Sequence, residues 1–350
     1  MFGNVKYLKV IQPGELDEYL ENGWYRMQQS IFTAHFINYQ NDFYSLVWLR
    51  NRLDDYTESS TSKKLKKLNS KFRIEVAPFN NITDGHIALF KKYSSHKPLG
   101  WPSSLTNLLL NGREENIYNS FVLNLYEGTV LIGTCVFDVG NKSAAGITSF
   151  YDPEYSSFSL GKYLIYRVVE HCKQMQLEYF YPGYFAPGIK EFDYKLGIGN
   201  ACLEYYDLPA SRWLPLSEYS SSKLMLPKML EKLTQLRYEL RAIGIASTLA
   251  YYAHFNFAAE VETAGGIWDF PVFLYCDGGN NFNLDLIVVY NPIDSCYHLY
   301  SSEKCSQSED FFGYHGKTVF RNMFDFADSY FKSHDIKLFA NVLRQVWAVQ

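Results

Sequence analysis

The clearest pattern of apolar and polar positions lies in the middle of the chain. Residues 129–138 form a short apolar run that is rich in β-branched side chains and bounded by glycines, which is typical of a largely buried strand. Residues 144–150 fit a second strand, and Pro153 prevents it from pairing further. From Ser159 onward apolar residues recur at three- and four-residue spacing, which predicts a helix, and residues 177–181 predict another strand. The unit therefore reads strand, strand, helix, strand.

The start of that helix is the part of the unit best suited to chemistry. Unpaired amide groups and the positive end of the helix dipole attract a phosphate or a developing oxyanion. Asp152 and several tyrosines lie beside it in the sequence. The residues alone leave two readings open, because Asp152 and Ser159 are also the residue types that form an Asp-Pro turn and a helix cap.

Similar patterns predict elements on both sides of this unit. A hairpin should join residues 121–126 to residues 130–137 across Glu127 and Gly128, and Ser103 should cap a short helix that ends at Leu110. Further helices are predicted at 15–25, 84–95, 226–243 and 318–331, and further strands at 44–50, 272–276, 284–290 and 296–300.

Charge is nearly balanced along the chain, which has 33 basic and 37 acidic residues and a formal net charge of −4. A polyanionic partner would therefore need a local basic patch. The dense basic run is at residues 63–73 and includes Lys63, Lys64, Lys66 and Lys67. From charge alone a solvated helix face is the better interpretation, and contact with a nucleic-acid backbone is the alternative.

Cysteine usage and hydropathy exclude several classes of protein. The six cysteines stand singly without a CxxC pair, so we predict neither a zinc site nor a disulfide framework, and no metal or other cofactor. The chain has no apolar stretch long enough for a signal peptide or a membrane span, which predicts a cytoplasmic protein that does not bind membranes. Aromatic residues make up 17%, and they serve core packing more often than stacking on bases.

Four short motifs resemble those of a known family in their order and spacing. They are YDP at 151–153, SLG at 159–161, YFYPGY at 179–184 and YK at 194–195. The order of elements resembles the core of the GNAT acyltransferase superfamily. Within it, the motifs are similar to the YDP, SLG, YxYxGY and YK series of the aminoacyl-tRNA–protein transferases of the N-end rule pathway.

A fifth motif both supports and limits this resemblance. The sequence GWYR at 23–26 is similar to the GWRR of the same family, with Tyr25 in place of an arginine. In the family a cysteine cluster follows, whereas residues 30–40 hold none, so metal or haem chemistry attributed to that cluster cannot be transferred to this chain.

The resemblance implies an α+β fold, with a GNAT-like acyltransferase core around a mixed central sheet and an extra C-terminal α+β region. It divides the chain into an N-terminal transferase-like region at 1–75, a GNAT-like catalytic domain at 76–216, and a C-terminal region at 217–350 whose role it does not indicate.

The implied activity moves arginine or leucine from a charged tRNA to the N-terminal α-amine of an acceptor protein. Such a reaction needs alignment, loss of a proton from the amine and stabilisation of an oxyanion, but no protein nucleophile or metal. Two alternatives stay open: a GNAT-type N-acyltransferase that uses acyl-CoA, and a non-catalytic protein that retains the fold. The Q/RxxGxG/A phrase of acyl-CoA-binding members is absent, which counts against the first.

The resemblance also assigns site residues. Asp152 would orient or deprotonate the amine, Ser159 would face the ester or the terminal ribose, and tyrosines would stack on the terminal adenine. The predicted catalytic residues are Asp152, Tyr151, Ser159 and Lys195. The predicted substrate-binding residues, which would contact the aminoacyl-tRNA or the acceptor N-terminus, are Gly161, Tyr181, Tyr184, Trp24, Arg26, Lys63, Lys64, Lys66 and Lys67.

Overall fold

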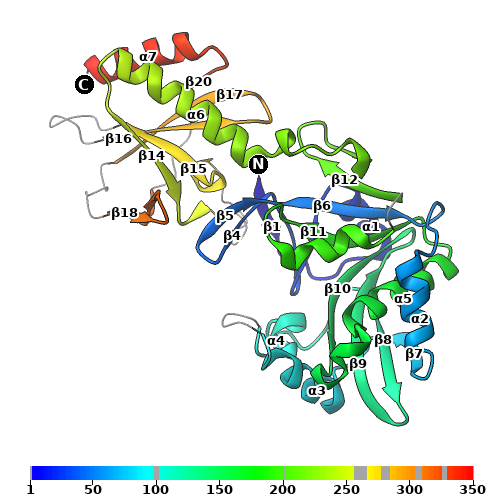
Figure 1. Cartoon of the computed structure of the whole chain (residues 1–350). Helices are drawn as coiled ribbons and strands as arrows, with labels where there is room; N and C mark the ends of the chain where they lie inside the picture. The colour runs from blue at the N-terminus through cyan, green and yellow to red at the C-terminus, as the bar shows by residue number, and fades with distance from the viewer. Residues whose placement is uncertain are drawn as a thin grey trace.

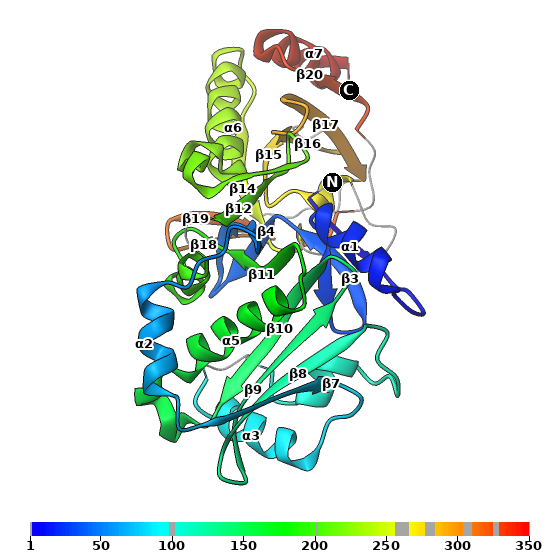
Figure 2. The ribbon, with the colours of Figure 1, turned by 90° about the vertical axis from the view of Figure 1, so that its right-hand side faces the viewer.

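The computed structural model describes residues 2–97, 102–199, 202–255, 266–276, 284–303, 310–324 and 329–349. Two large sheets dominate the fold. In Figures 1 and 2 the helices α2 to α5 lie with strands β7 to β10 at one end of the molecule, and α6 and α7 lie with strands β14 to β20 at the other. The N-terminal strands lie between them. Within the described residues, no helix is long and apolar enough to cross a membrane.

The larger sheet has eight strands and is mixed, because β10 and β11 are parallel whereas the other neighbours whose register is known are antiparallel. The predicted hairpin across Glu127 and Gly128 is confirmed. In sheet order the strands are β13 (Arg212–Pro215), β12 (Leu203–Asp207), β6 (Val47–Arg52), β11 (Tyr179–Phe185), β10 (Ser143–Tyr151), β9 (Val130–Val139), β8 (Ser120–Glu127) and β7 (Arg73–Pro78).

Alternating side chains bury both faces of this sheet. Leu123 of β8 packs with α5 (Leu160–Gln174) on one face, whereas its neighbour Val122 packs with α3 (Asp84–Ser94) and α4 (Leu105–Leu110) on the other. The helix α2 (Ser60–Leu68) contacts α5 (Figure 2). Ser104, and not the predicted Ser103, caps α4, because its side chain accepts from the Asn107 N–H.

The ladder between β10 and β11 is short. Their pairing runs from Ser143 and Tyr179 to Ala145 and Tyr181 and then stops, although both strands continue. After that point β10 stays paired with β9, and β11 pairs with β6. Both strands carry a register shift there, between Gly146 and Thr148 in β10 and between Phe180 and Gly183 in β11. The edge of β11 beyond Tyr181, here called the open edge, is therefore not paired with β10.

The N-terminal region forms two small sheets and contributes to the large one. The predicted boundary after residue 75 falls inside β7, and β6 lies at the centre of the eight-stranded sheet. The first helix ends before Gly23 and does not reach Tyr25, which begins a strand. The elements are β1 (Gly3–Lys6), α1 (Pro13–Glu21), β2 (Tyr25–Met27), β3 (Ser30–Ala34), β4 (Phe36–Tyr39) and β5 (Asp42–Ser45).

The C-terminal region builds a separate seven-stranded sheet that packs against two helices, so the predicted α+β class is confirmed. Its single core also includes Phe2, Phe36 and Phe43 from the N-terminal region. The elements in chain order are α6 (Met225–Ala242), β14 (Ser247–Tyr252), β15 (Val272–Cys276), β16 (Leu284–Asn291), β17 (Cys296–Glu303), β18 (Phe311–Tyr314), β19 (Lys317–Phe320), β20 (Phe331–Ser333) and α7 (Ile336–Val349).

The predicted closing helix at 318–331 is wrong. His315 and Gly316 adopt positive φ of 45° and 77°, which forms a tight turn and pairs β18 with β19. Apolar residues in this stretch, such as Phe320 and Phe324, match helical spacing but fill the core from a strand and the chain after it. The helix that closes the chain begins later, at Ile336.

Candidate functional site

The chain turns sharply between β10 and α5. The Asp152 carboxylate accepts from the Glu154 N–H at 3.0 Å and caps a short 3₁₀ helix, Pro153–Phe158, as an Asp-Pro turn would. Ser159 follows with a left-handed φ of 50° and precedes α5 without a capping hydrogen bond from its side chain. The expectation that the Ser159 hydroxyl caps this helix is therefore wrong, and the hydroxyl is not committed to that task.

Tyr151 and Gly161 lie against each other at the start of α5. A Cβ atom at Gly161 would lie 3.1 Å from Cε1 of Tyr151, so the glycine lets the ring pack over the first turn. The same ring lies 5.4 Å from that of Tyr93 in α3. The structure thus brings together Tyr151, Asp152, Ser159 and Gly161, four of the predicted site residues.

Lys92 joins this group, and the sequence did not indicate its role. Its ammonium donates to the Asp152 carboxylate at 2.8 Å and to the Glu154 carboxylate at 2.7 Å. Hydrogen bonds to Asp152 and then Glu154 raise the pKa of Lys92. Because the Asp152 side chain is only 13% exposed whereas that of Lys92 is 41% exposed, the lysine is the solvent-facing partner of the pair.

Lys195 lies at the open edge of β11. Its Nζ donates to the Tyr184 carbonyl at 2.6 Å, and a Cβ atom at Gly183 would lie 3.4 Å from it. Three aromatic rings surround the amine, those of Tyr184, Phe192 and Tyr194, with centroids at 4.8, 5.2 and 5.8 Å. We call these rings and Lys195 the lysine cage.

Burial disfavours the charged form of Lys195. The side chain is half-buried, and no carboxylate pairs with it in the part of the chain that the structure describes. Burial lowers its pKa from 10.5 to about 8. The cage is built on a 3₁₀ helix, Lys190–Gly197, that packs on β11. Phe192 departs from the wording of the related motif but supplies one wall.

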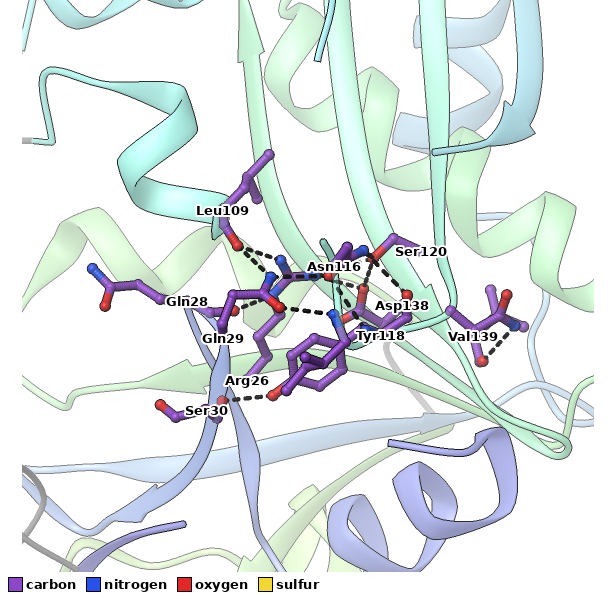
Figure 3. A network of polar contacts seen from close by, with 12 residues as sticks. Arg26, Gln28, Gln29, Ser30, Leu109, Asn116, Tyr118, Ser120, Asp138 and Val139 are labelled. Carbon is purple, nitrogen blue, oxygen red and sulfur yellow. Dashed lines mark hydrogen bonds and ion pairs between the residues drawn. The ribbon is translucent and has the colours of Figure 1, made fainter. Parts of the chain in front are cut away.

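Arg26 and Tyr181 lie in the core, where neither side chain offers a surface to a substrate. Arg26 binds the Asp138 carboxylate at 2.9 Å, and the two side chains are only 2% and 0% exposed. Figure 3 shows this ion pair inside a network in which Arg26 also donates to the Gln28 and Leu109 carbonyls, both at 2.7 Å. Tyr181 is 1% exposed and packs against Trp213.

Trp24 is half-buried. Its ring packs near that of Tyr19, with the Lys6 ammonium 4.6 Å from its centroid. These contacts hold α1 against the strand that follows it. Trp24 and Arg26 were both predicted as substrate contacts, and of the two only the Arg26 side chain is fully buried.

The basic run forms an exposed face of α2. Lys63, Lys64 and Lys67 are exposed and have no ion pair within the described residues. Lys66 instead lies 3.4 Å from Glu170 of α5. The end of α2 adjoins the start of α5, because the Asn69 side chain donates to the Phe158 carbonyl at 3.1 Å.

No group of three or more His, Cys, Asp or Glu side chains could hold a metal ion in the described ranges. The cysteines that the structure describes are free thiols, and Cys135, Cys172, Cys202 and Cys276 are buried. His35, from the stretch where related proteins carry cysteines, is a buried histidine.

A family model described as "Arginine-tRNA-protein transferase, C terminus" matches residues 85–202. An aspartate/glutamate leucyltransferase of Acinetobacter baylyi is 28% identical over 147 residues, which is 40% of this chain and 53% of that protein. The protein of the same name from Leptospira interrogans is 29% identical over 172 residues, 48% of this chain and 66% of that protein. The chain thus spans between about half and two thirds of the length of these curated relatives.

Solved structures show weaker likenesses. A GCN5-related N-acetyltransferase from Kribbella flavida is 8% identical, with 44% of this chain and 52% of that chain covered and a TM-score of 0.28. A GCN5-related glucosamine N-acetyltransferase region of a fungal β-N-acetylglucosaminidase is 12% identical, with 55% and 21% covered and a TM-score of 0.32. Scores this low add no weight to the site described here.

The matched segment contains the turn at Asp152, the start of α5, the open edge of β11 and Lys195. Residues 85–202 are thus similar to the arginine-tRNA-protein transferase C-terminal family, and the curated relatives that match this chain are named as leucyltransferases.

Proposed function

We propose that this protein transfers an amino acid, leucine or arginine, from an aminoacyl-tRNA to the N-terminal α-amine of an acceptor protein. The observation that carries the proposal is the lysine cage, which holds an amine of lowered pKa at the open edge of β11, within the segment that matches the transferase family.

The reaction requires one proton to leave the attacking nitrogen. The α-amine attacks the ester carbonyl, a C–N bond forms, and the tetrahedral oxyanion collapses as the C–O bond to the terminal ribose breaks. The nitrogen loses a proton and the ribose oxygen gains one. Lys195, with a pKa of about 8, is neutral in roughly one molecule in ten at pH 7 and can accept that proton.

The start of α5 suits the donor. Its amide groups and dipole favour the ester oxygen or a phosphate, and the Ser159 hydroxyl makes no capping bond that would have to be broken. The end of α2 adjoins this helix start, and the exposed lysines of α2 suit the phosphates of the tRNA acceptor stem. Tyr151, packed over the first turn, offers a ring for the terminal adenine.

Asp152 is assigned to the acceptor's α-amino group, which it binds as an ammonium; this group gives one proton to water and then attacks the ester as the neutral amine. Its carboxylate is already paired with one ammonium, that of Lys92, and the α-ammonium of an acceptor has the same charge and donors. In this assignment the acceptor displaces Lys92, which remains bound to Glu154.

A transfer assay tests the proposal. Total tRNA charged with amino acids is incubated with the full chain and reporter peptides that begin with Asp, Glu, Arg or Lys. We expect a peptide mass increase equal to one leucyl or arginyl residue, and none with N-acetylated peptides or uncharged tRNA. Lys195→Met should abolish most of the transfer. If no peptide gains mass while coenzyme A raises the melting temperature, the acyl-CoA alternative would replace this proposal.

A further inference from the structure

A cavity of about 260 Å³ lies where the C-terminal region meets the eight-stranded sheet. It is lined by chain segments around His35 and Ser45, by the end of β12 and by the start of α6. Every lining residue lies outside the segment 85–202 that matches the family model.

His35 brings an imidazole ring to this cavity. The residue is only 3% exposed, and its ring nitrogens make no hydrogen bond to the described residues. Its backbone is held on both sides, because its N–H donates to the Phe2 carbonyl and its carbonyl accepts from the Leu46 N–H. Burial lowers the pKa of the ring to about 3, so at neutral pH the imidazole offers one donor and one acceptor. The ring can therefore hydrogen-bond a polar group of an occupant.

The charge around the cavity favours an anion. Lys228, in the first turn of α6, is half-buried and makes no ion pair among the described residues. Lys223 donates to the Tyr205 hydroxyl at 2.6 Å and lies 4.0 Å from Asp207. One oxygen of Asp207 accepts from the Ala210 N–H at 3.1 Å. Two lysines against one aspartate leave one net positive charge.

The start of α6 adds to that charge. The helix has 18 residues, and its N-cap residue, Leu224, makes no side-chain capping bond. The Leu226 N–H donates to the Ser45 hydroxyl at 3.1 Å, and Pro227 has no N–H to contribute. The positive end of the helix dipole therefore faces a wall of the cavity without an acidic side chain in its first turn.

The remaining wall is largely apolar and suits a carbon skeleton. The ring of Tyr206 stacks with that of His35 at 6.4 Å, so the imidazole keeps a fixed orientation. A volume of about 260 Å³ lies below the usual range for drug-sized sites and fits a molecule the size of an amino acid or a phenyl acid. The apolar lining residues are Leu46, Val47, Leu208, Pro209, Leu224, Met225 and Pro292.

We propose that this cavity binds a small molecule with an apolar body and one oxyanion, phosphate or carboxylate, that lies between Lys228, Lys223 and the start of α6 and is hydrogen-bonded by His35. The occupant would join β12 of the eight-stranded sheet to α6 of the C-terminal region. This site does not depend on the proposed transfer activity.

Calorimetric titration of the full chain with three probes tests this site. Phenyl phosphate and 3-phenylpropionate carry the two oxyanions, and 3-phenylpropan-1-ol is the neutral control. We expect one anion to bind with a Kd on the order of 1 mM and the alcohol to bind about tenfold more weakly. Whichever anion binds more tightly identifies phosphate or carboxylate as the recognised group.

Site-directed variants test whether the anion binds in this cavity. Lys228→Met should weaken binding of the preferred anion about tenfold. His35→Phe, which keeps a ring against Tyr206, should weaken it by a similar factor. Lys232→Met, one turn further along α6 and outside the cavity, should leave the affinity unchanged. Lys223→Met replaces Lys228→Met if that variant does not fold. Failure of both anions to bind at about 20 mM, equal binding of the alcohol, or equal losses in Lys228→Met and Lys232→Met would each overturn the proposal.

Discussion

Lys195 is held where its charged form is disfavoured, yet it keeps a hydrogen bond to the Tyr184 carbonyl. If it accepts a proton during transfer, it must be neutral. We therefore expect kcat/KM to rise with pH and to level off above a pKa near 8. Lys195→Arg should not restore the activity, because a guanidinium stays protonated. A rate that is flat between pH 6 and pH 9, measured with an acceptor whose own α-amine pKa is known, would contradict this role.

The same lowered pKa gives Lys195 an unfavourable effect on stability. The pKa is about 8 in the folded protein and 10.5 for an ordinary lysine, so the unfolded chain binds more protons between these values. The penalty is complete below pH 8 and is relieved as the pH rises toward 10.5. Lys195→Met should therefore keep or raise the melting temperature at pH 7 while transfer is lost, which separates the catalytic effect from a folding defect.

Asp152 can be tested against its partner, Lys92. Asp152→Asn keeps an oxygen for the Glu154 N–H but removes the charge, so stability should fall by less than about 1 kcal/mol. If the carboxylate orients the acceptor, transfer should drop by about a hundredfold or more, whereas Lys92→Met should leave it nearly intact. Equal losses of transfer in the two variants would mean that only the ion pair matters. Both are compared by initial rates and thermal melts.

Arg26, one of the predicted substrate contacts, is buried in an ion pair with Asp138. Arg26→Met leaves the Asp138 carboxylate buried in the core without its ion-pair partner. We expect the free energy of unfolding, measured with urea, to fall by about 3 kcal/mol or more. Arg26→Met combined with Asp138→Asn should recover part of that loss because the buried charge is gone. Arg73→Met, which removes an exposed pair with Glu75, is the control and should change stability by less than about 1 kcal/mol.

At the scale of elements, the exposed face of α2 carries a prediction about RNA. Changing Lys63, Lys64 and Lys67 to Gln should weaken tRNA binding and reduce the slope of log K against log salt by about one for each phosphate that a lysine no longer neutralises. The melting temperature should stay unchanged, because these side chains make no ion pair with the described residues.

A control removes the same charge elsewhere. Lys232, Arg241 and Lys337 lie on α6 and α7, and their replacement by Gln should leave the salt slope as it is. Equal slopes for the two triple variants would exclude α2 as the specific RNA contact.

The sequence pattern was most informative where one element buries one face. The hairpin of β8 and β9 follows from short apolar runs bounded by turn residues, and the helix α5 follows from three- and four-residue spacing; both are confirmed. The stretch around Phe320 misled because aromatic residues of a strand and of the chain after it, such as Phe320 and Phe324, reproduce helical spacing. The tight turn at His315 and Gly316 pairs β18 with β19, and the pattern of apolar residues did not reveal this pairing.

The sequence motifs indicated the candidate site residues but not the side chains that surround them. The positions of Asp152, Ser159 and Lys195 came from resemblance, whereas the Lys92 pair and the ring of Phe192 over Lys195 depend on contacts between distant elements. Arg26 shows the reverse case. Its motif indicated a substrate contact, but its partner Asp138 lies 112 residues away and could not be identified from the sequence.

At the scale of the whole molecule, the C-terminal region and the N-terminal region share one core. Phe43 of β5 is 6% exposed, and its ring lies 4.9 Å from that of Tyr251 in β14. Phe43→Ala should cost about 3 kcal/mol and increase hydrogen exchange in β14, although the residues lie in different regions. Leu68→Ala, at an exposed site on α2, should change stability by about 0.5 kcal/mol at most. Unchanged exchange in β14 would mean that the two regions unfold independently.

The position of β6 in the sheet also affects how this chain folds while the ribosome synthesises it. β6 ends at Arg52 and pairs with β11 and β12, which begin at Tyr179 and Leu203. At roughly 5 to 20 residues per second, a nascent β6 waits about 6 to 25 s for its first neighbour. The backbone N–H groups of Phe2 and Gly3 wait longer, because the carboxylate that binds them is on Asp269. An early strand with two unpaired edges is a target for chaperones and for aggregation, so slowing translation between β6 and β11 should lower the yield of soluble protein.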